Sequence, residues 1–375
     1  MSRWAWAEID HDAIRHNVEV MRRAVAPSAV WAVVKADGYG HGAVDVARTA
    51  LDAGAEGLCV ALVDEGVELR GAGIDAPILL LSEQPLAEVT RISEHRLIPM
   101  VYTRSYVDAL AALDVEALDV HLKVDTGMQR VGVSAGEAPS LAAAVIRHAP
   151  RLRLAGVATH LASADDVADP ATSDQLATFE AVLAALPVNP ANPVPPAIHA
   201  ANSAGALAHP SARYSFVRAG IAIYGISPGH GVDHLCRDLR PAMSLRARVA
   251  FVKRVAAGSR ISYGLRHTFT RSTTVAAVPI GYADGVPRRL FETGGEVLIG
   301  GRRRPIVGVV TMDQLMVDVG DDPIAVGDEV VLIGEQGGQR VGAEEWADRL
   351  GTIGYEIVCG VSRRIARSPR RSIGD

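Results

Sequence analysis

The sequence contains little cysteine and no pattern of metal ligands. Three cysteines occur in 375 residues, Cys59, Cys236 and Cys359, and they lie far apart in the chain. An odd number of scattered cysteines gives no disulfide framework and fits a protein of the reducing cytoplasm. The twelve histidines show no HExxH or comparable spacing. We therefore expect a cytoplasmic protein without a metal site.

Strong net charge and long apolar runs are also missing. The formal net charge is −5, which gives no reason to expect a nucleic-acid or anionic-membrane partner. No apolar run is long enough to cross a bilayer, and residues 1–8 lack the apolar core of a signal peptide. We therefore expect neither a nucleic acid nor a membrane as a partner.

The first two thirds of the chain predict a (β/α)₈ barrel. Eight short apolar runs, most of them separated by helix-sized gaps, occupy the predicted barrel domain, residues 10–235. An open, doubly wound sheet is the alternative, but residues 37–42 (DGYGHG) lack the GxGxxG spacing of a dinucleotide site. The runs are Val30–Lys35, Gly57–Ala61, Pro77–Leu81, Leu97–Tyr102, Val120–Val124, Leu154–His160, Ala197–Ala200 and Val217–Tyr224.

The last third predicts a mainly-β domain, residues 236–375, against which residues 1–9 could pack. Short β-rich runs alternate there with glycine and aspartate turns, and one helical pattern covers Ala343–Gly351. The runs are Leu245–Val255, Thr273–Pro279, Gly295–Gly300, Arg304–Val310, Leu315–Val319 and Glu329–Ile333.

Lys35 ends the first apolar run of the barrel. A glycine-rich turn follows it, and a helical pattern begins at Ala43. The carboxyl ends of barrel strands are where catalytic groups collect. Burial favours the neutral amine of a lysine, which is able to form an imine. Lys35 is therefore a candidate nucleophile.

Other polar residues recur at the predicted strand ends. Asn202 and Ser203 follow the seventh run and Gly220 lies within the eighth, where barrels often bind a phosphate. An imine-forming lysine together with a phosphate site indicates either a pyridoxal phosphate (PLP) enzyme or a lysine-imine aldolase for a phosphorylated sugar. These residues alone leave both open.

A set of motifs in order along the chain resembles the alanine racemase family. They are residues 6–10 (WAEID), 34–42 (VKADGYGHG), 123–128 (KVDTGM), 159–160 (TH), 199–203 (HAANS), 218–221 (RAGI), 262–264 (SYG), 281–285 (GYADG), 312–314 (MDQ) and 355–356 (YE). The lysine motif alone is typical of a wider set of barrel PLP proteins. Tyr263 and the β-domain motifs narrow the resemblance to amino-acid racemases.

The resemblance implies a PLP site in which Lys35 holds the cofactor as a Schiff base. Arg218 would face the pyridine nitrogen, and Arg130 and the backbone of Met312 would bind the substrate carboxylate. Tyr263, Tyr282 and Met312 would come from the second subunit of a head-to-tail homodimer. The remaining cofactor-binding residues implied by the family are Tyr39, His160, Asn202, Ser203, Gly220, Ile221 and Tyr355.

The family chemistry places one acid/base group on each face of the substrate. The resemblance implies that Lys35 serves the D-alanine face and Tyr263 the opposite face. A phenol is a weak base at neutral pH, so a hydrogen-bonded chain from Tyr263 through His160 to Arg218 would favour the phenolate. A permanently charged arginine would also leave the pyridine nitrogen unprotonated, which favours quick reprotonation.

The resemblance also implies a carboxylated Lys123 that orients Arg130, with an ordinary Lys123–Asp125 ion pair as the alternative. Asp165, Tyr282 and Arg288 would line the substrate entryway. Three positions depart from the family pattern: Ala219 and Gly354 replace prolines, and Val309 replaces an arginine of the entryway.

The function that the resemblance implies is racemisation of L- and D-alanine to supply peptidoglycan. A racemase for serine or another small amino acid is the close alternative. A PLP decarboxylase or aldolase is disfavoured by Arg218, and a PLP-carrier protein by the second domain.

Overall fold

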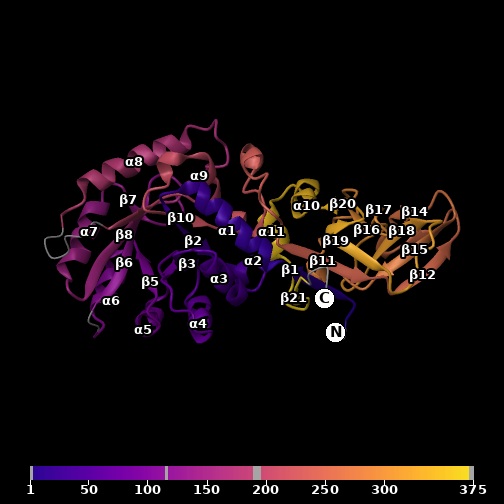
Figure 1. Ribbon diagram of the computed structural model, residues 1–375, viewed down its shortest axis with the longest axis horizontal. Helices are drawn as coiled ribbons and strands as arrows, with labels where there is room; N and C mark the ends of the chain where they lie inside the picture. The colour runs from indigo at the N-terminus through magenta and orange to yellow at the C-terminus, as the bar shows by residue number, and fades with distance from the viewer. Residues whose placement is uncertain (1–2, 115–116, 189–195, 371–375) are drawn as a thin grey trace. The chain divides into compact units, whose positions relative to one another are not determined.

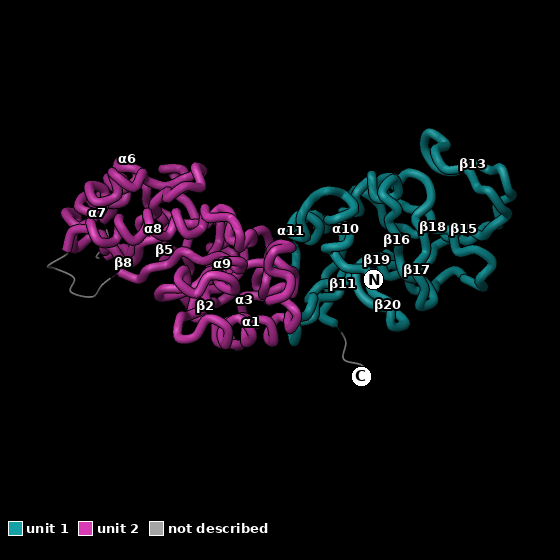
Figure 2. The backbone as a smooth tube through the Cα atoms, turned by 90° about the horizontal axis from the view of Figure 1, so that it is seen from above, with its two compact units in different colours: residues 1–13, 39–42, 240–375 teal, residues 14–38, 43–239 magenta. Residues whose placement is uncertain are grey.

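The chain divides into two compact units. The computed structural model describes residues 3–114, 117–188 and 196–370, so the outermost residues of the predicted second domain lie outside the description. Unit 1 comprises residues 1–13, 39–42 and 240–375, and unit 2 comprises residues 14–38 and 43–239 (Figure 2).

Unit 2 is a nearly closed barrel of eight parallel strands (Figure 1). The strand order is β10-β2-β3-β4-β5-β6-β8-β9. Ser215 N donates to Ile198 O (2.9 Å) and Arg218 N donates to Ala201 O (3.0 Å), which joins the two ends of the sheet. The strands are β2 (Ala29–Val33), β3 (Gly57–Val60), β4 (Ile78–Leu80), β5 (Ile98–Val101), β6 (Leu118–Asp125), β8 (Leu152–Ala158), β9 (Ala197–His199) and β10 (Phe216–Ala219), with β7 (Val133–Ser134) beside β6.

Helices alternate with these strands, as the sequence predicts. In α3, Ala43, Val46, Ala47 and Ala50 are buried, which is the i, i+3, i+4, i+7 stripe of an amphipathic helix. The helices are α1 (His11–Val25), α2 (Lys35–Tyr39), α3 (Ala43–Asp52), α4 (Val63–Gly71), α5 (Val89–Glu94), α6 (Arg104–Ala111), α7 (Ala138–Arg147), α8 (Ala171–Ala185) and α9 (Ser203–Ala208), with 3₁₀ turns η1 (Leu86–Glu88), η2 (Pro210–Ala212), η3 (Ile221–Tyr224) and η4 (His230–Leu235).

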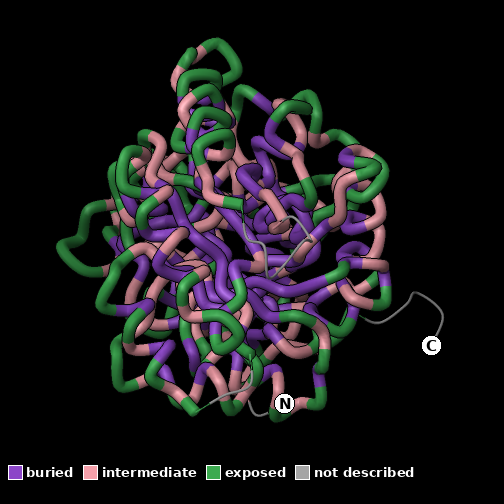
Figure 3. The backbone as a smooth tube through the Cα atoms, turned by 90° about the vertical axis from the view of Figure 1, so that its left-hand side faces the viewer, coloured by how far each residue is buried: buried purple, intermediate pink, exposed green. Residues whose placement is uncertain are grey.

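A stack of rings fills the barrel interior. The Phe216 ring lies between Trp31 and His199, with centroid distances of 4.4 and 4.2 Å. His121 packs against His199, and Gly156 leaves room for it, because a Cβ there would overlap the His121 ring. Buried positions fill the middle of the strands and exposed ones lie on the outer turns (Figure 3). This layer supports the polar residues at the strand ends.

Unit 1 is mainly β. Strand β1 (Ala5–Ile9) lies between antiparallel β11 (Met243–Arg248) and parallel β21 (Ala366–Pro369). The other elements of this sheet are β16 (Glu296–Ile299), β17 (Arg302–Pro305), β19 (Glu329–Gln336) and β20 (Gln339–Val341). A second sheet contains β12 (Phe251–Val255), β15 (Thr273–Val278) and β18 (Leu315–Gly320). The remaining elements are the hairpin β13 (Arg260–Ile261) and β14 (His267–Thr268), the 3₁₀ turns η5 (Tyr263–Leu265) and η6 (Tyr282–Asp284), and the helices α10 (Ala343–Leu350) and α11 (Gly354–Cys359).

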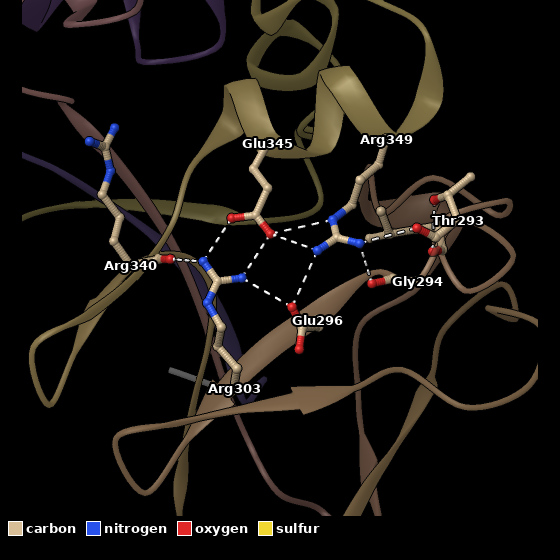
Figure 4. Close-up of polar contacts among 8 residues, drawn as sticks. Thr293, Gly294, Glu296, Arg303, Arg340, Glu345 and Arg349 are labelled. Atoms are coloured by element: carbon tan, nitrogen blue, oxygen red, sulfur yellow. Dashed lines mark hydrogen bonds and ion pairs between the residues drawn. The ribbon is translucent and has the colours of Figure 1, made fainter.

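A network of four charged side chains ties α10 to the large sheet of unit 1 (Figure 4). Arg303 of β17 donates to both carboxylate oxygens of Glu345 (2.8 Å each) and to Glu296 (3.1 Å). Arg349, one turn after Glu345 on α10, donates to the same two carboxylates. Because each charge has two partners, the network fixes the helix to β16 and β17.

The structure confirms the predicted barrel followed by a mainly-β domain, and its strand order excludes the open doubly wound sheet. Three predicted strands differ clearly in extent. The run Arg304–Val310 is a strand only as far as Pro305. The run Leu245–Val255 is two strands, because β11 pairs with β19 whereas β12 pairs with β15 in another sheet. The run Val217–Tyr224 ends as strand at Ala219 and continues as η3. A fully buried apolar run does not distinguish a strand from a buried turn.

None of the helices in the described part of the chain combines the length and the apolar character that a membrane span requires.

Candidate active site

Lys35 follows the end of β2 and begins a left-handed turn. Val34 N donates to Cys59 O (2.9 Å), which continues the barrel pairing up to the lysine. Ala36, Asp37 and Gly38 then take φ values of 52°, 54° and 59°. Left-handed conformation costs about 1–2 kcal/mol for each residue that carries a Cβ. This turn therefore needs stabilising contacts from residues outside the turn.

Glu65 of α4 supplies that support. Its Oε1 accepts a hydrogen bond from Ala36 N (2.6 Å), and its Oε2 accepts from Ala61 N (2.7 Å) and Leu62 N (3.1 Å). The carboxylate thus ties the end of β2 to the end of β3. Sequence reasoning missed Glu65, although a glutamate three residues into a helix is the signal of a capping box.

Arg218 is the centre of the buried polar cluster at the barrel mouth. Its Nη1 donates to His199 Nδ1 (2.6 Å), and its Nη2 donates to Thr159 O (2.9 Å), Ala200 O (2.8 Å) and His160 Nδ1 (3.2 Å). The side chain is buried. Among the described residues, its Nε has no hydrogen-bond acceptor.

These bonds determine the tautomers of three histidines, because arginine only donates. His199 and His160 must accept at Nδ1, so each carries its proton on Nε2. His199 Nε2 then donates to His121 Nδ1 (2.9 Å). Burial, with Arg218 as the next cause, lowers the pKa of His160 and His199 well below 6.5. Burial also lowers the pKa of His121, to about 4. All three are neutral at pH 7.

Lys123 faces the same interior as Arg218. It is 5% exposed, and burial, followed by the charges of Arg218 and Arg130, lowers its pKa to about 7. No ion pair with Lys123 is found among the described residues. The Asp125 carboxylate accepts instead from the backbone of the next turn, Gly127 N (2.9 Å) and Gln129 N (3.1 Å). That turn carries the exposed Arg130.

The candidate phosphate site lies at the ends of β9 and β10. Asn202 Oδ1 caps α9 by accepting from Gly205 N (2.9 Å). Ser203 Oγ accepts from Gly220 N (2.9 Å) and Ala222 N (3.3 Å). The Ser203 hydroxyl proton is therefore available to an anion, beside the backbone N–H of Ile221 at the start of η3.

The two predicted phosphate-binding tyrosines lie together in unit 1. The Tyr39 and Tyr355 rings have a centroid distance of 6.0 Å and are tilted by 50°. Gly40 makes the close approach possible, because a Cβ there would lie 2.5 Å from Val358 O in the helix that carries Tyr355. Arg367 Nε also donates to Gly40 O (3.0 Å).

Three other predicted site residues are exposed on unit 1. The exposed fractions are 71% for Tyr263, 42% for Tyr282 and 52% for Met312. Tyr282 and Met312 lie on adjoining loops, since Tyr282 N donates to Thr311 O (2.9 Å) and Ala283 N to Met312 O (3.0 Å). Tyr282 and Met312 are therefore exposed next to each other in the fold.

The predicted entryway residues are divided between the units. Asp165 lies in unit 2 against Gly229 and Gly231, where a Cβ would overlap its carboxylate and its backbone oxygen respectively. Arg288 is exposed on unit 1. Val309, which stands where the family has an arginine, is 1% exposed, so this position presents no charge at the surface.

Comparison with known protein families, sequences and structures gives alanine racemases with the same two-domain fold. Residues 9–228 match the N-terminal domain of alanine racemase and residues 242–369 match its C-terminal domain. The alanine racemase of Symbiobacterium thermophilum is 48% identical over 369 residues, 97% of each chain. The structure of alanine racemase from E. faecalis has a TM-score of 0.91 and 39% identity, covering 98% of each chain. The Bacillus anthracis structure, with bound L-Ala-P, has a TM-score of 0.92 and 39% identity, covering 99% of this chain and 96% of that one.

Together with these relatives, a (β/α)₈ barrel with lysine, arginine and histidine at its mouth, followed by a mainly-β domain, places the protein in the class of barrel-type amino-acid racemases. The chain belongs to the alanine racemase family.

Proposed function

We propose that the protein interconverts L- and D-alanine with PLP as its cofactor, and that its active site is completed by a second copy of the chain. The observation that carries this proposal is the buried Arg218. Its Nη1 and Nη2 are held by four acceptors, and its Nε–H has no partner among the described residues. A donor that stays protonated fits a pyridine nitrogen that carries no proton.

The residues of the barrel mouth fit the rest of the cofactor. Lys35 supplies an amine at the strand end, and Ser203 has a free hydroxyl proton beside the N–H of Ile221. We assign the phosphate to these groups, together with Gly220 and the hydroxyls of Tyr39 and Tyr355. PLP, when bound, withdraws electrons from the α-carbon of an amino acid joined to it and so makes the α-proton removable.

Lys35 and Tyr263 are the two acid/base groups. The Lys35 amine exchanges the proton on one face of the α-carbon, and the Tyr263 phenol exchanges it on the other. His160 carries its proton on Nε2, because Nδ1 accepts from Arg218, so it donates towards a phenolate. The exposure of Tyr263, Tyr282 and Met312 supports a homodimer in which these residues serve the partner's site.

Arg130 and the backbone N–H of Met312 bind the substrate carboxylate in this proposal. Lys123, surrounded by Arg218, Arg130 and Lys35 and with a pKa lowered to about 7, offers a neutral amine that reacts with CO₂. The resulting carbamate would neutralise the local positive charge and orient Arg130. D-Alanine made in this way would supply peptidoglycan synthesis.

A racemisation assay with added PLP tests the proposal, run with L-Ala, L-Ser and L-Lys on wild type, Lys35→Ala and Tyr263→Phe. We expect L-Ala to be the best substrate and both variants to lose at least about 100-fold in rate, because each lacks one proton-transfer group. Faster turnover of L-Ser would overturn the assignment to alanine. Unchanged activity of Tyr263→Phe in both directions would overturn the two-base scheme.

A further inference from the structure

The Tyr263 phenol has no side-chain support in the described part of its own chain. It is 71% exposed, and among the described residues no hydrogen bond or ring contact holds it. A proton-transfer group nevertheless has to stand within tenths of an ångström of its productive position. Its location therefore depends on the backbone of the turn η5 and on the residue before that turn.

The backbone before Tyr263 is strained. Ser262 has φ 64° and ψ −177°, a region populated almost only by glycine. Ser262 O accepts from Leu265 N (3.0 Å), which closes a four-residue turn around the tyrosine. Gly264 (φ 72°) and Leu265 (φ 49°) are left-handed as well.

A hydrogen bond from the serine side chain holds this strained turn. Ser262 Oγ donates to Val309 O at 2.6 Å, across 47 positions of sequence. Val309 is buried, so the acceptor belongs to a fixed part of the domain. Gly308 (φ 73°) leaves room for the contact, because a Cβ there would lie 2.7 Å from Ser262 Cβ.

The backbone conformation alone would favour glycine at position 262, so the serine needs another explanation, which the bond to Val309 provides. We infer that Ser262 is a positioning residue for Tyr263: its hydroxyl anchors the turn to Val309 O and so fixes where the phenol is presented. The inference rests on the proposed function of Tyr263 as a proton-transfer group.

Two substitutions separate the anchor from the strain. Ser262→Gly removes the hydroxyl and also relieves the backbone, whereas Ser262→Ala removes the hydroxyl and keeps the strain. The matched control is Ser272→Ala, because the Ser272 hydroxyl accepts from Ala257 N (3.3 Å) elsewhere in this domain. We expect Ser262→Gly to unfold at or above the wild-type temperature and Ser262→Ala to unfold below it.

Activity and amide exchange give the first readout. We expect kcat/KM to fall about 10- to 100-fold in both Ser262 variants, because a displacement of about 1 Å has that effect on a catalytic group. Amide hydrogen exchange of residues 263–265 should quicken in both, with or without PLP. The control should match wild type in both measurements.

The isotope effect of α-deuterated alanine distinguishes positioning from a general structural defect. If only proton transfer by Tyr263 slows, the isotope effect rises with L-alanine, because Tyr263 removes its α-proton. The isotope effect falls with D-alanine, because Lys35 removes its α-proton. A smaller folded fraction or a weaker dimer lowers both rates and leaves both isotope effects unchanged.

If Ser262→Gly shows wild-type amide exchange and wild-type isotope effects while the separate variant Tyr263→Phe is inactive, the inference about Ser262 is overturned and the proposed function stands. Full activity of Tyr263→Phe would overturn the proposed function instead.

Discussion

The Glu65 carboxylate lies 2.6 Å from the backbone nitrogen of Ala36, the residue that follows Lys35. This bond joins α4 to the left-handed turn at the end of β2. The turn is unfavourable by itself, so the position of the lysine depends on a residue 30 positions further along the chain.

We expect Glu65→Gln to lower the free energy of unfolding by about 2 kcal/mol, because hydrogen bonds to a charged group are lost and an amide N–H replaces one acceptor. Urea unfolding measures the change. Glu68→Gln, at an exposed position of the same helix, is the control and should have little effect. Equal stability of the two variants would show that Glu65 does not support the turn.

His121 should make the barrel sensitive to acid. Burial lowers its pKa from 6.5 to about 4, so between these pH values the unfolded chain binds a proton that the folded chain does not. Stability is therefore lost as the pH falls through this window, by about 1.4 kcal/mol for each pH unit. His121→Gln, whose carbonyl can still accept from His199, should reduce that dependence in urea unfolding at pH 7, 6 and 5. An unchanged slope would contradict a neutral, buried His121.

Lys123 should carry CO₂ as a carbamate. Its pKa of about 7 leaves much of the amine neutral and reactive above neutral pH, and its positively charged neighbours favour the anionic product. ¹³C NMR with labelled bicarbonate should show one carbamate signal that strengthens as the pH rises through 7. Lys123→Arg should abolish it and Lys253→Arg, at an exposed position on β12, should retain it. A carbamate signal that persists in Lys123→Arg would show that CO₂ is bound at another amine.

The charge network of unit 1 should contribute to stability. Arg303 is the main cause of a lowered pKa of Glu345, so this contribution is present above the ordinary pKa of 4.5 and is lost as the pH falls below it. We expect Glu345→Gln to lower the free energy of unfolding at pH 7 by about 1 kcal/mol, because these side chains are partly exposed. Glu344→Gln, whose partner Arg340 is 3.9 Å away, should lose less. Identical losses would mean that the network adds nothing to a single ion pair.

The fold could be predicted from the sequence because its signals are local. Apolar runs of strand length alternate with amphipathic stretches such as Ala43–Asp52, and the structure has the predicted barrel and β domain. The internal position of β1, between β11 and β21, depends on pairing with strands more than 230 residues away. No local pattern in residues 5–9 carries that information.

Site residues could be predicted from the sequence only where the residue type and its position indicate a particular reaction or ligand. A lysine at a strand end and a serine near a phosphate position give such signals, and the family motifs added Arg218 and Tyr263 as predictions. Glu65 and Ser262 act through single contacts across 29 and 47 positions. His121 acquires its tautomer only through His199 and Arg218, a relationship that exists after folding and not in the sequence.

The most direct test of the shared active site is activity in mixed dimers of two inactive variants. Lys35→Ala and Tyr263→Phe chains would be unfolded together, refolded in equal amounts with PLP and assayed for alanine racemisation. If each site takes Lys35 from one chain and Tyr263 from the other, hybrid dimers contain one intact site, and the mixture should recover about a quarter of wild-type activity. A mixture that contains hybrid dimers but remains as inactive as either variant alone would contradict the account.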